Sequence, residues 1–243
     1  MFDGYSVLAV VPARGGSKGI PKKNLKTVGG VSLVGRVGKL TRSLDWLDAC
    51  VLSTDDSAIA EEGRRHGLDV PFLRPGDLAS DVAGSLGVWR HAWVAAEAHY
   101  DRSFDVSILL EPTSPLRRGE DVTATVKALL DGHHKSAATV SPAPAHFTPH
   151  KCLTVAEGRI GFYHPQGAQH STRQTIPTYY FRNGICYALR RDTLMQDDAI
   201  IGDDCAAVII ERPIVNIDDP FDLELAEFLL EREQQRDDER SRA

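Results

Sequence analysis

A group of glycines and cationic side chains follows the first apolar segment of the chain. Residues 5–11 are almost all apolar, and residues 12–24 then read PARGGSKGIPKKN. The three glycines of this stretch allow a tight turn that brings backbone N–H groups close to a phosphate, and its serine adds a hydroxyl. The cations in and beside the stretch are Arg14, Lys18, Lys22, Lys23 and Lys26. This combination of residues indicates a site for a polyphosphate.

The position of this stretch supports the same interpretation. It begins where a buried strand is expected to stop, and parallel sheets bind ligands at the carboxyl ends of their strands. It contains neither the GxxxxGK[ST] pattern of a P-loop nor the GxGxxG pattern of dinucleotide-binding proteins. The alternative interpretation is a glycine-rich turn whose lysines are simply solvated.

The composition limits the classes of partner. The chain has 243 residues, 42% of them hydrophobic, and a net charge of -6, so it can bury a core but has no overall basic field for nucleic acid or an anionic membrane. Its four cysteines lie far apart without a CxxC pair, which argues against a zinc site or a disulfide framework. The segment 5–11 is too short to span a bilayer. These features predict a cytoplasmic protein.

The first half of the chain alternates short β-branched segments with longer segments of helical periodicity, as parallel α/β proteins do. The expected strands are Tyr5–Val11, Cys50–Thr54, Val70–Leu73, Val106–Leu110 and Ser136–Ser141. The expected helices are Val31–Arg42, Ser57–His66, Ser85–Tyr100 and Gly119–Asp131. Asp55 and Asp56 are expected to end a strand and cap the helix that follows.

Prolines and histidines interrupt this alternation after Ser141, and we interpret residues 143–182 as an inserted arm. The core is expected to resume with strands Gly184–Leu189, Ala206–Ile210 and Ile214–Ile217. A last helix is predicted from Pro220 to about Arg232, with a frayed, charged tail over residues 231–243. Its face of Phe221, Leu225, Phe228 and Leu229 is expected to dock on the sheet.

Six motifs, in this order, resemble the CMP-sialic acid synthetase family, the acylneuraminate cytidylyltransferases. They are ARGGSKGIPKKN, VLSTDD, FLRPGDLASD, LLEPTSPLR, RNGICY and NIDDPFDLELAE, and they cover nearly the whole chain. The resemblance implies one Rossmann-like, three-layer nucleotidyltransferase domain over residues 1–243 with a mostly parallel twisted sheet. The arm would serve dimerisation and sugar binding in a homodimer. The implied reaction joins CMP from CTP to a 2-keto-3-deoxy sugar acid and releases pyrophosphate, with Mg²⁺ as cofactor.

The resemblance also implies roles for nucleotide-binding residues. Arg14, Lys18 and Lys23 would be catalytic and would hold the triphosphate. The guanidinium of Arg74 would read the cytosine carbonyl, because its fixed fork of donors can select cytosine over uracil. The further nucleotide contacts would come from Ser17, Asn24, Ser80 and Ser85. The alternative for residues 74–81 is a polar loop that caps the following helix.

For the metal, the resemblance points to Asp218 together with position 216, where relatives commonly carry Asp and this chain carries Asn. An amide carbonyl can bind Mg²⁺ but brings no charge, so the affinity for the metal could fall. Asp219 could then assist. Alternatively, Asp218 and Asp219 only cap the last helix.

The sugar acid would be bound by residues from the fourth strand and the arm. Relatives often carry Gln where this chain has Glu111, whose carboxylate cannot donate a hydrogen bond and would repel an acidic sugar. The other expected sugar contacts are Lys151, Arg173, Asn183 and Tyr187. Solvated cations, a turn with Gly184 and a core aromatic are the alternatives for these four.

Other functions remain open from the sequence. The nearest is the same chemistry on legionaminic, pseudaminic or octulosonic acid, or with GTP. A non-catalytic nucleotide-sensing module is a second possibility, because Asn216 could have cost the protein its turnover. A dinucleotide-dependent oxidoreductase ranks last, since the GxGxxG pattern is missing.

Overall fold

The computed structural model describes residues 1–80, 83–169, 173–197 and 199–242. Its centre is a six-stranded sheet in the order β10-β6-β9-β5-β1-β4. Neighbouring strands run parallel except around β9, which is antiparallel to both β5 and β6. The strands are β1 (Val7–Pro12), β4 (Ala49–Ser53), β5 (Val106–Leu109), β6 (Ser136–Pro142), β9 (Tyr180–Arg190) and β10 (Cys205–Ile209). The expected α/β fold with a mostly parallel sheet is confirmed.

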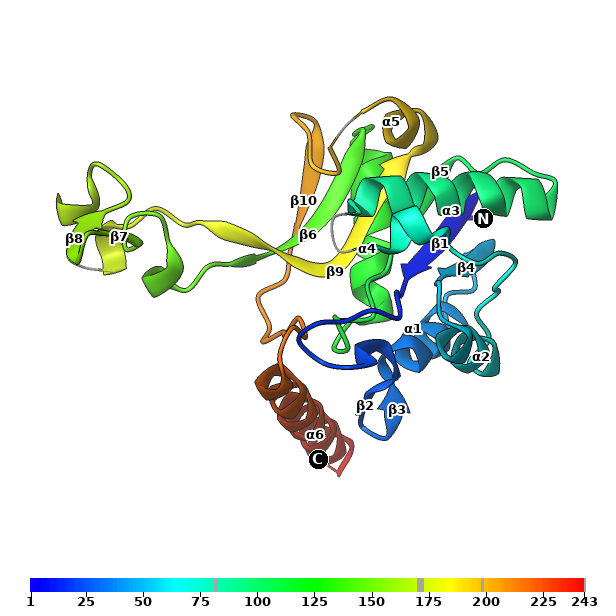
Figure 1. Cartoon of the computed structure of the whole chain (residues 1–243), viewed down its shortest axis with the longest axis horizontal. Coiled ribbons are helices and arrows are strands. Elements are labelled where there is room, and N and C mark those ends of the chain that lie inside the picture. Colours follow the sequence, from blue (N-terminus) through cyan, green and yellow to red (C-terminus); the bar gives the residue numbers. More distant parts are fainter. Residues whose placement is uncertain (81–82, 170–172, 198, 243) are drawn as a thin grey trace.

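The central strand β1 shows how the sheet forms two cores. Successive side chains of a strand point to opposite faces, and all of β1 before Pro12 is buried. Val7, Ala9 and Val11 pack with α1, α2 and α4, whereas Leu8 and Val10 pack with α3 and α5. The helices are α1 (Leu33–Thr41), α2 (Ser57–Arg65), α3 (Ser85–Tyr100), α4 (Gly119–Asp131) and α5 (Arg191–Gln196). The fold therefore has three layers (Figure 1).

Two expected strands are wrong. In the stretch Val70–Leu73, Pro71 lacks the N–H that a ladder needs, so pairing stops at an isolated bridge between Asp69 and Val51. A short 3₁₀ helix, Gly76–Ala79, follows. The stretch Ile214–Ile217 joins no strand of the described part of the chain. Val215 and Ile217 pack in a small separate cluster under the last helix, whereas Ile214 packs against the main core.

That helix, α6 (Pro220–Arg242), also differs from the prediction. It continues through the expected tail, whose Glu, Arg and Gln residues are good helix formers. Leu225 and Leu229 pack in the separate cluster beside the hairpin of β2 (Thr27–Val28) and β3 (Val31–Ser32), and not on the central sheet. Phe221 and Phe228, which were expected to dock, are 68% and 55% exposed.

Residues between β6 and β9 extend away from the body as an arm (Figure 1). Its far end carries the hairpin of β7 (Leu153–Ala156) and β8 (Arg159–Phe162), every residue of which is exposed. Three 3₁₀ helices, Ala145–Phe147, Gly167–Gln169 and Arg173–Thr175, lie in the same segment. Within the described residues, no helix is long and apolar enough to cross a membrane.

Replacing Asp56 with Ala should lower the free energy of unfolding by about 1 kcal/mol. As expected from the sequence, Asp56 is the N-cap of α2, and its carboxylate accepts hydrogen bonds from the N–H groups of Ala58 and Ile59 at 2.8 and 3.0 Å. Urea denaturation measures the change. The control Glu61→Ala, an exposed position of the same helix, should stay within ~0.5 kcal/mol. Equal losses in both variants would contradict the capping role.

Candidate active site

A cleft of about 280 Å³ opens where β1 and β5 end. Eight of the residues singled out from the sequence line it: Arg14, Ser17, Lys23, Asn24, Arg74, Ser80, Ser85 and Glu111. The remaining lining residues, Pro12, Leu78, Ala83, Val88, Pro112 and Thr113, carried no signal as separate positions. The cleft thus joins the glycine-rich loop, the loop before α3 and the loop after β5.

The glycine-rich loop is held against its neighbours by close backbone contacts. The N–H of Gly15 donates to Asp55 Oδ1 over 2.9 Å, so Asp55 occupies one amide that could have met a phosphate. The side-chain amide of Asn24 donates to the carbonyl of Arg14 at 3.0 Å. A Cβ on Gly19 would lie only 2.4 Å from the carbonyl oxygen of Asp218. The loop therefore needs glycine at position 19 to reach the Asp218 segment.

Lys23 meets Asp218 at the edge of the cleft. Its ammonium donates to the carbonyl of Ile217 at 2.7 Å and to Asp218 Oδ1 at 3.2 Å. The Lys23 side chain is 15% exposed and that of Asp218 82% exposed, so the lysine is fixed while the carboxylate stays accessible. Lys18, in contrast, is exposed and does not line the cleft.

The helix-capping alternative for the two aspartates applies to Asp219 alone. Asp219 Oδ1 accepts a hydrogen bond from the N–H of Asp222 at 3.1 Å. The carboxylate of Asp222 in turn accepts from the N–H groups of Asp218 and Asp219 at 2.8 and 3.0 Å. The first turn of α6 is therefore capped without the Asp218 carboxylate, which faces Lys23 instead.

Arg74 is buried in the wall of the cleft. Its Nε donates to Ser53 Oγ at 3.1 Å and its Nη2 to the Ser53 carbonyl at 2.6 Å. Two of its nitrogen atoms are therefore already hydrogen-bonded to the last residue of β4. Burial lowers the pKa of Arg74, and the neighbouring charge of Arg14 lowers it further. Ser85 is the first residue of α3, so the positive end of this helix dipole adds to the cationic side of the cleft.

Glu111 is the acidic residue among those that line the cleft. Burial raises the pKa of its carboxyl group, although the charges of Arg117, Arg182 and Lys23 oppose the rise. A Cβ on Gly184, whose φ is +70°, would lie 3.0 Å from both Glu111 Oε2 and Asn216 Nδ2. The two side chains therefore converge on one point, and only glycine leaves room for them.

Three oxygen-bearing side chains could serve a divalent cation here: Asp218, Asn216 and Glu111. Within the described residues, no group of three or more His, Cys, Asp or Glu side chains could hold a metal by itself. Magnesium does not need one, because one or two carboxylates together with substrate phosphates and water suffice. The accessible Asp218 carboxylate does not line the cleft itself but pairs with Lys23, which does, and it fits that requirement.

The expected sugar contacts from the second half of the chain divide between the core near Glu111 and the arm. Asn183 is 1% exposed, and its amide is used by Thr139, Ser141 and the N–H of Ile185. Tyr187 is buried in the core, which raises its pKa to about 12. Lys151 lies in the arm two residues before β7, a strand that stands away from the body of the molecule (Figure 1). Arg173 begins a 3₁₀ helix of the arm, but its side chain lies outside the described part.

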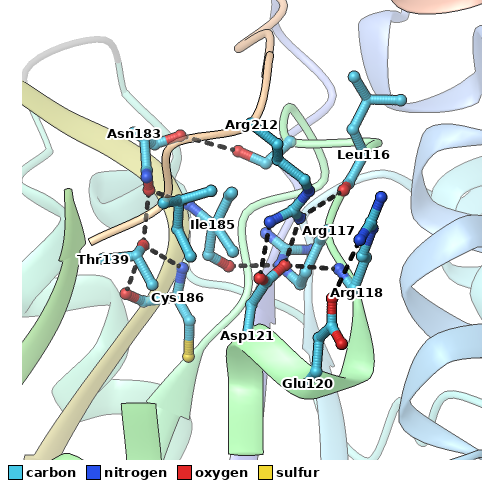
Figure 2. Close-up of polar contacts among 12 residues, drawn as sticks. Leu116, Arg117, Arg118, Glu120, Asp121, Thr139, Asn183, Ile185, Cys186 and Arg212 are labelled. Carbon is cyan, nitrogen blue, oxygen red and sulfur yellow. Dashed lines mark hydrogen bonds and ion pairs between the residues drawn. The ribbon is translucent and has the colours of Figure 1, made fainter. Parts of the chain in front are cut away.

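Sequence reasoning missed Arg117, which is 8% exposed. Its guanidinium donates to the carbonyls of Glu111 at 2.6 Å and Gly184 at 3.2 Å, and also to that of Ile185 (Figure 2). It therefore ties the loop after β5 to the start of the buried part of β9. In the sequence, Arg117 is one more cation in a polar loop, and nothing there marks it as buried.

A mostly parallel sheet with a cationic glycine-rich loop and a nearby carboxylate at its carboxyl edge is the arrangement of a nucleotidyltransferase. Comparison with known proteins makes the class more specific. The cytidylyltransferase family model matches residues 8–185. The chain belongs to this family and is an enzyme of that class, which confirms the resemblance found in the motifs.

Individual relatives agree over nearly the full length. The chain is 28% identical over 226 residues to a post-translational flagellin modification protein B of Campylobacter coli, which covers 92% of this chain and 94% of the relative. It is 27% identical over 225 residues to a CMP-N,N'-diacetyllegionaminic acid synthase of Campylobacter jejuni, covering 92% and 94%. The fold matches a CMP:2-keto-3-deoxy-manno-octonic acid synthetase solved with CTP, with a TM-score of 0.68, 18% identity, and coverage of 94% and 99%.

Replacing Gly19 with Ala should weaken CTP binding by about tenfold or more. The new Cβ would meet the Asp218 carbonyl at 2.4 Å, and a backbone atom cannot move aside as a side-chain tip can. The loop and the Asp218 segment must then separate. The control is Gly16→Ala, because a Cβ on Gly16 has no neighbour within 4 Å among the described residues. Calorimetric titration with CTP measures both variants, and equal affinities would contradict the close-contact argument.

Proposed function

We propose that this enzyme transfers CMP from CTP to the anomeric hydroxyl of a nonulosonic acid and releases pyrophosphate. The observation that carries the proposal is the ion pair between Asp218 and Lys23, a cation that lines the cleft beside the glycine-rich loop, since it brings a carboxylate suited to a metal next to the expected phosphate site. Relatives named for legionaminic acid and for pseudaminic acid support the class of sugar. They do not single out one sugar acid.

In this reaction the anomeric oxygen attacks the α-phosphorus, and the bond from that phosphorus to the bridging oxygen of pyrophosphate breaks. Negative charge grows on the phosphoryl oxygens and on the leaving group. Arg14 and Lys23 line the cleft and would stabilise this charge, and the hydroxyl of Ser17 would add a donor. Lys18, being exposed, would contact the outer phosphates only after the loop moves.

Asp218 would hold Mg²⁺, with Asn216 and Glu111 as further oxygen donors. When bound, the ion would neutralise phosphate charge and orient the triphosphate. Lys23 already pairs with Asp218, so it would remain beside the phosphates that the ion contacts. The second acidic side chain, Glu111, lines the cleft and would favour a sugar that offers hydrogen-bond donors there.

We further propose that the enzyme acts as a homodimer joined through the arm. The arm exposes a group of large apolar side chains that a monomer would leave in water: Phe147, Leu153, Val155, Ile160, Phe162 and Tyr163. Exposed apolar patches of this kind mark interfaces. Because Lys151 lies beside β7, which stands away from the body of its own chain, a partner's cleft is where it would contact an acidic sugar.

Turnover tests the function directly. With CTP, Mg²⁺ and a panel of neuraminic, legionaminic, pseudaminic and octulosonic acids, pyrophosphate should appear with at least one acid, and GTP should not replace CTP. Lys23→Ala and Arg14→Ala should each lower kcat on the order of 10²-fold, because a charge partner of the transition state is lost. The control Lys26→Ala changes an exposed lysine that does not line the cleft. Absence of pyrophosphate with every acid would refute the proposal, and CTP binding without turnover would favour a nucleotide sensor.

The dimer proposal predicts a change of mass in solution. Val155 and Ile160 are 73% and 71% exposed and pair with each other across the β7–β8 hairpin. Val155→Asp together with Ile160→Asp should convert the dimer into a monomer in sedimentation equilibrium, because charges would have to be buried at the interface. Thr154→Asp and Gly161→Asp, the neighbouring exposed pair, give a control on the other face of the hairpin. A wild-type monomer would refute the proposal.

A further inference from the structure

A second cavity, of about 350 Å³, lies between α6 and the loop that enters α4. It shares no lining residue with the active-site cleft. Four arginines from three separate parts of the chain line it, together with an apolar floor. The residues that carry the argument are Leu116, Arg118, Arg212, Leu229, Arg232 and Arg236. Such a concentration of guanidinium groups is unusual in a chain of net charge -6.

Two of these arginines are free to bind a ligand. Arg232 and Arg236 are exposed and lie one turn apart on α6, so they share a face of the helix. Neither forms an ion pair with any residue whose side chain the structure describes. Arg118 is paired with Glu120 at 3.0 Å and with Glu233. Glu233 is the one acidic residue among those lining the cavity.

Arg212 is held in the wall with one donor unsatisfied. Its Nη1 and Nη2 contact the carboxylate of Asp121 at 2.8 and 2.5 Å, and Nη2 also donates to the Leu116 carbonyl at 3.0 Å (Figure 2). Its Nε is buried and has no hydrogen-bond partner in the described structure. A buried donor without a partner costs free energy, which an incoming acceptor could recover.

We propose that this cavity binds a phosphate-bearing anion at a site separate from the active-site cleft. Guanidinium groups bind phosphate oxygens through paired, charge-assisted hydrogen bonds, and Arg232 and Arg236 present two such groups on one face. Leu116 and Leu229 form an apolar floor. The base or sugar of a nucleotide could pack on this floor, but a free phosphate compound could also bind to the arginines without using it. The shared chemistry is the phosphate, borne either by free pyrophosphate or by a nucleoside monophosphate.

The position of Arg212 connects this site to the cleft. The Leu116 carbonyl that Arg212 binds belongs to the loop that starts at Glu111, and its other partner, Asp121, accepts the N–H of Arg118 at 2.8 Å at the start of α4. A ligand that drew Arg212 towards it would therefore act on the loop that forms a wall of the active site. The binding site itself does not depend on the proposed sugar substrate.

Calorimetry in magnesium-free buffer tests the proposal, with inorganic pyrophosphate in one arm and CMP in the other. At least one ligand should show two classes of site on the wild-type protein. Arg232→Gln with Arg236→Gln should weaken the second class about tenfold or more, because two charged donors are lost. Arg14→Ala should weaken only the class in the cleft, which separates a failure of this proposal from a failure of the proposed function.

The matched control is Arg64→Gln with Arg65→Gln, which removes the same charge from exposed positions of α2 and should leave both classes intact. Thermal melts of all variants show whether each is folded. A single class that Arg14→Ala abolishes, for both ligands, would overturn the proposal. Retention of both classes after the Arg232 and Arg236 substitutions would also overturn it.

Discussion

The active site depends on how the carbonyl groups of one loop, residues 111–117, are held. Arginines bind three of them: Arg117 holds Glu111, Arg36 holds Pro115 at 3.1 Å, and Arg212 holds Leu116. The carbonyl of Thr113 accepts the N–H of Ile217 at 2.8 Å, which places Asp218 beside Lys23. The loop therefore carries both the acidic wall of the cleft and, through one backbone hydrogen bond, the carboxylate at its edge.

Holding a loop in this way requires a buried charge. Burial lowers the pKa of Arg117 to about 10, so its guanidinium stays protonated at neutral pH. A buried cation is costly unless its donors are satisfied, and here three carbonyls satisfy them while Glu111 and Asp121 lie near enough to offset the charge. A single buried side chain that reaches three carbonyls fixes the relative position of β5 and β9, where the sheet changes from parallel to antiparallel.

Where local pattern and packing agreed, the fold was predictable. The run of buried apolar residues in β1 and the acidic N-cap of α2 both match what the sequence indicated. The errors arose where an apolar segment had more than one place to pack. Ile214–Ile217 was expected to be a strand, and the phenylalanines of α6 were expected to pack on the sheet. Both predictions depended on which part of the protein these residues would contact in the folded chain. Periodicity shows that a face is apolar, and it does not show what covers that face.

The sequence by itself predicted a phosphate-binding loop, because the glycines, the cations and the preceding strand are contiguous in the chain. It also determined the family, through motifs in a given order. Only the tertiary structure decided that Lys23 meets Asp218, that the exposed Lys18 does not line the cleft, and that the amide of Asn183 is hydrogen-bonded inside the core. Lys23 and Asp218 are 195 positions apart. Contacts between such distant residues follow from sheet order and loop packing, which no local pattern encodes.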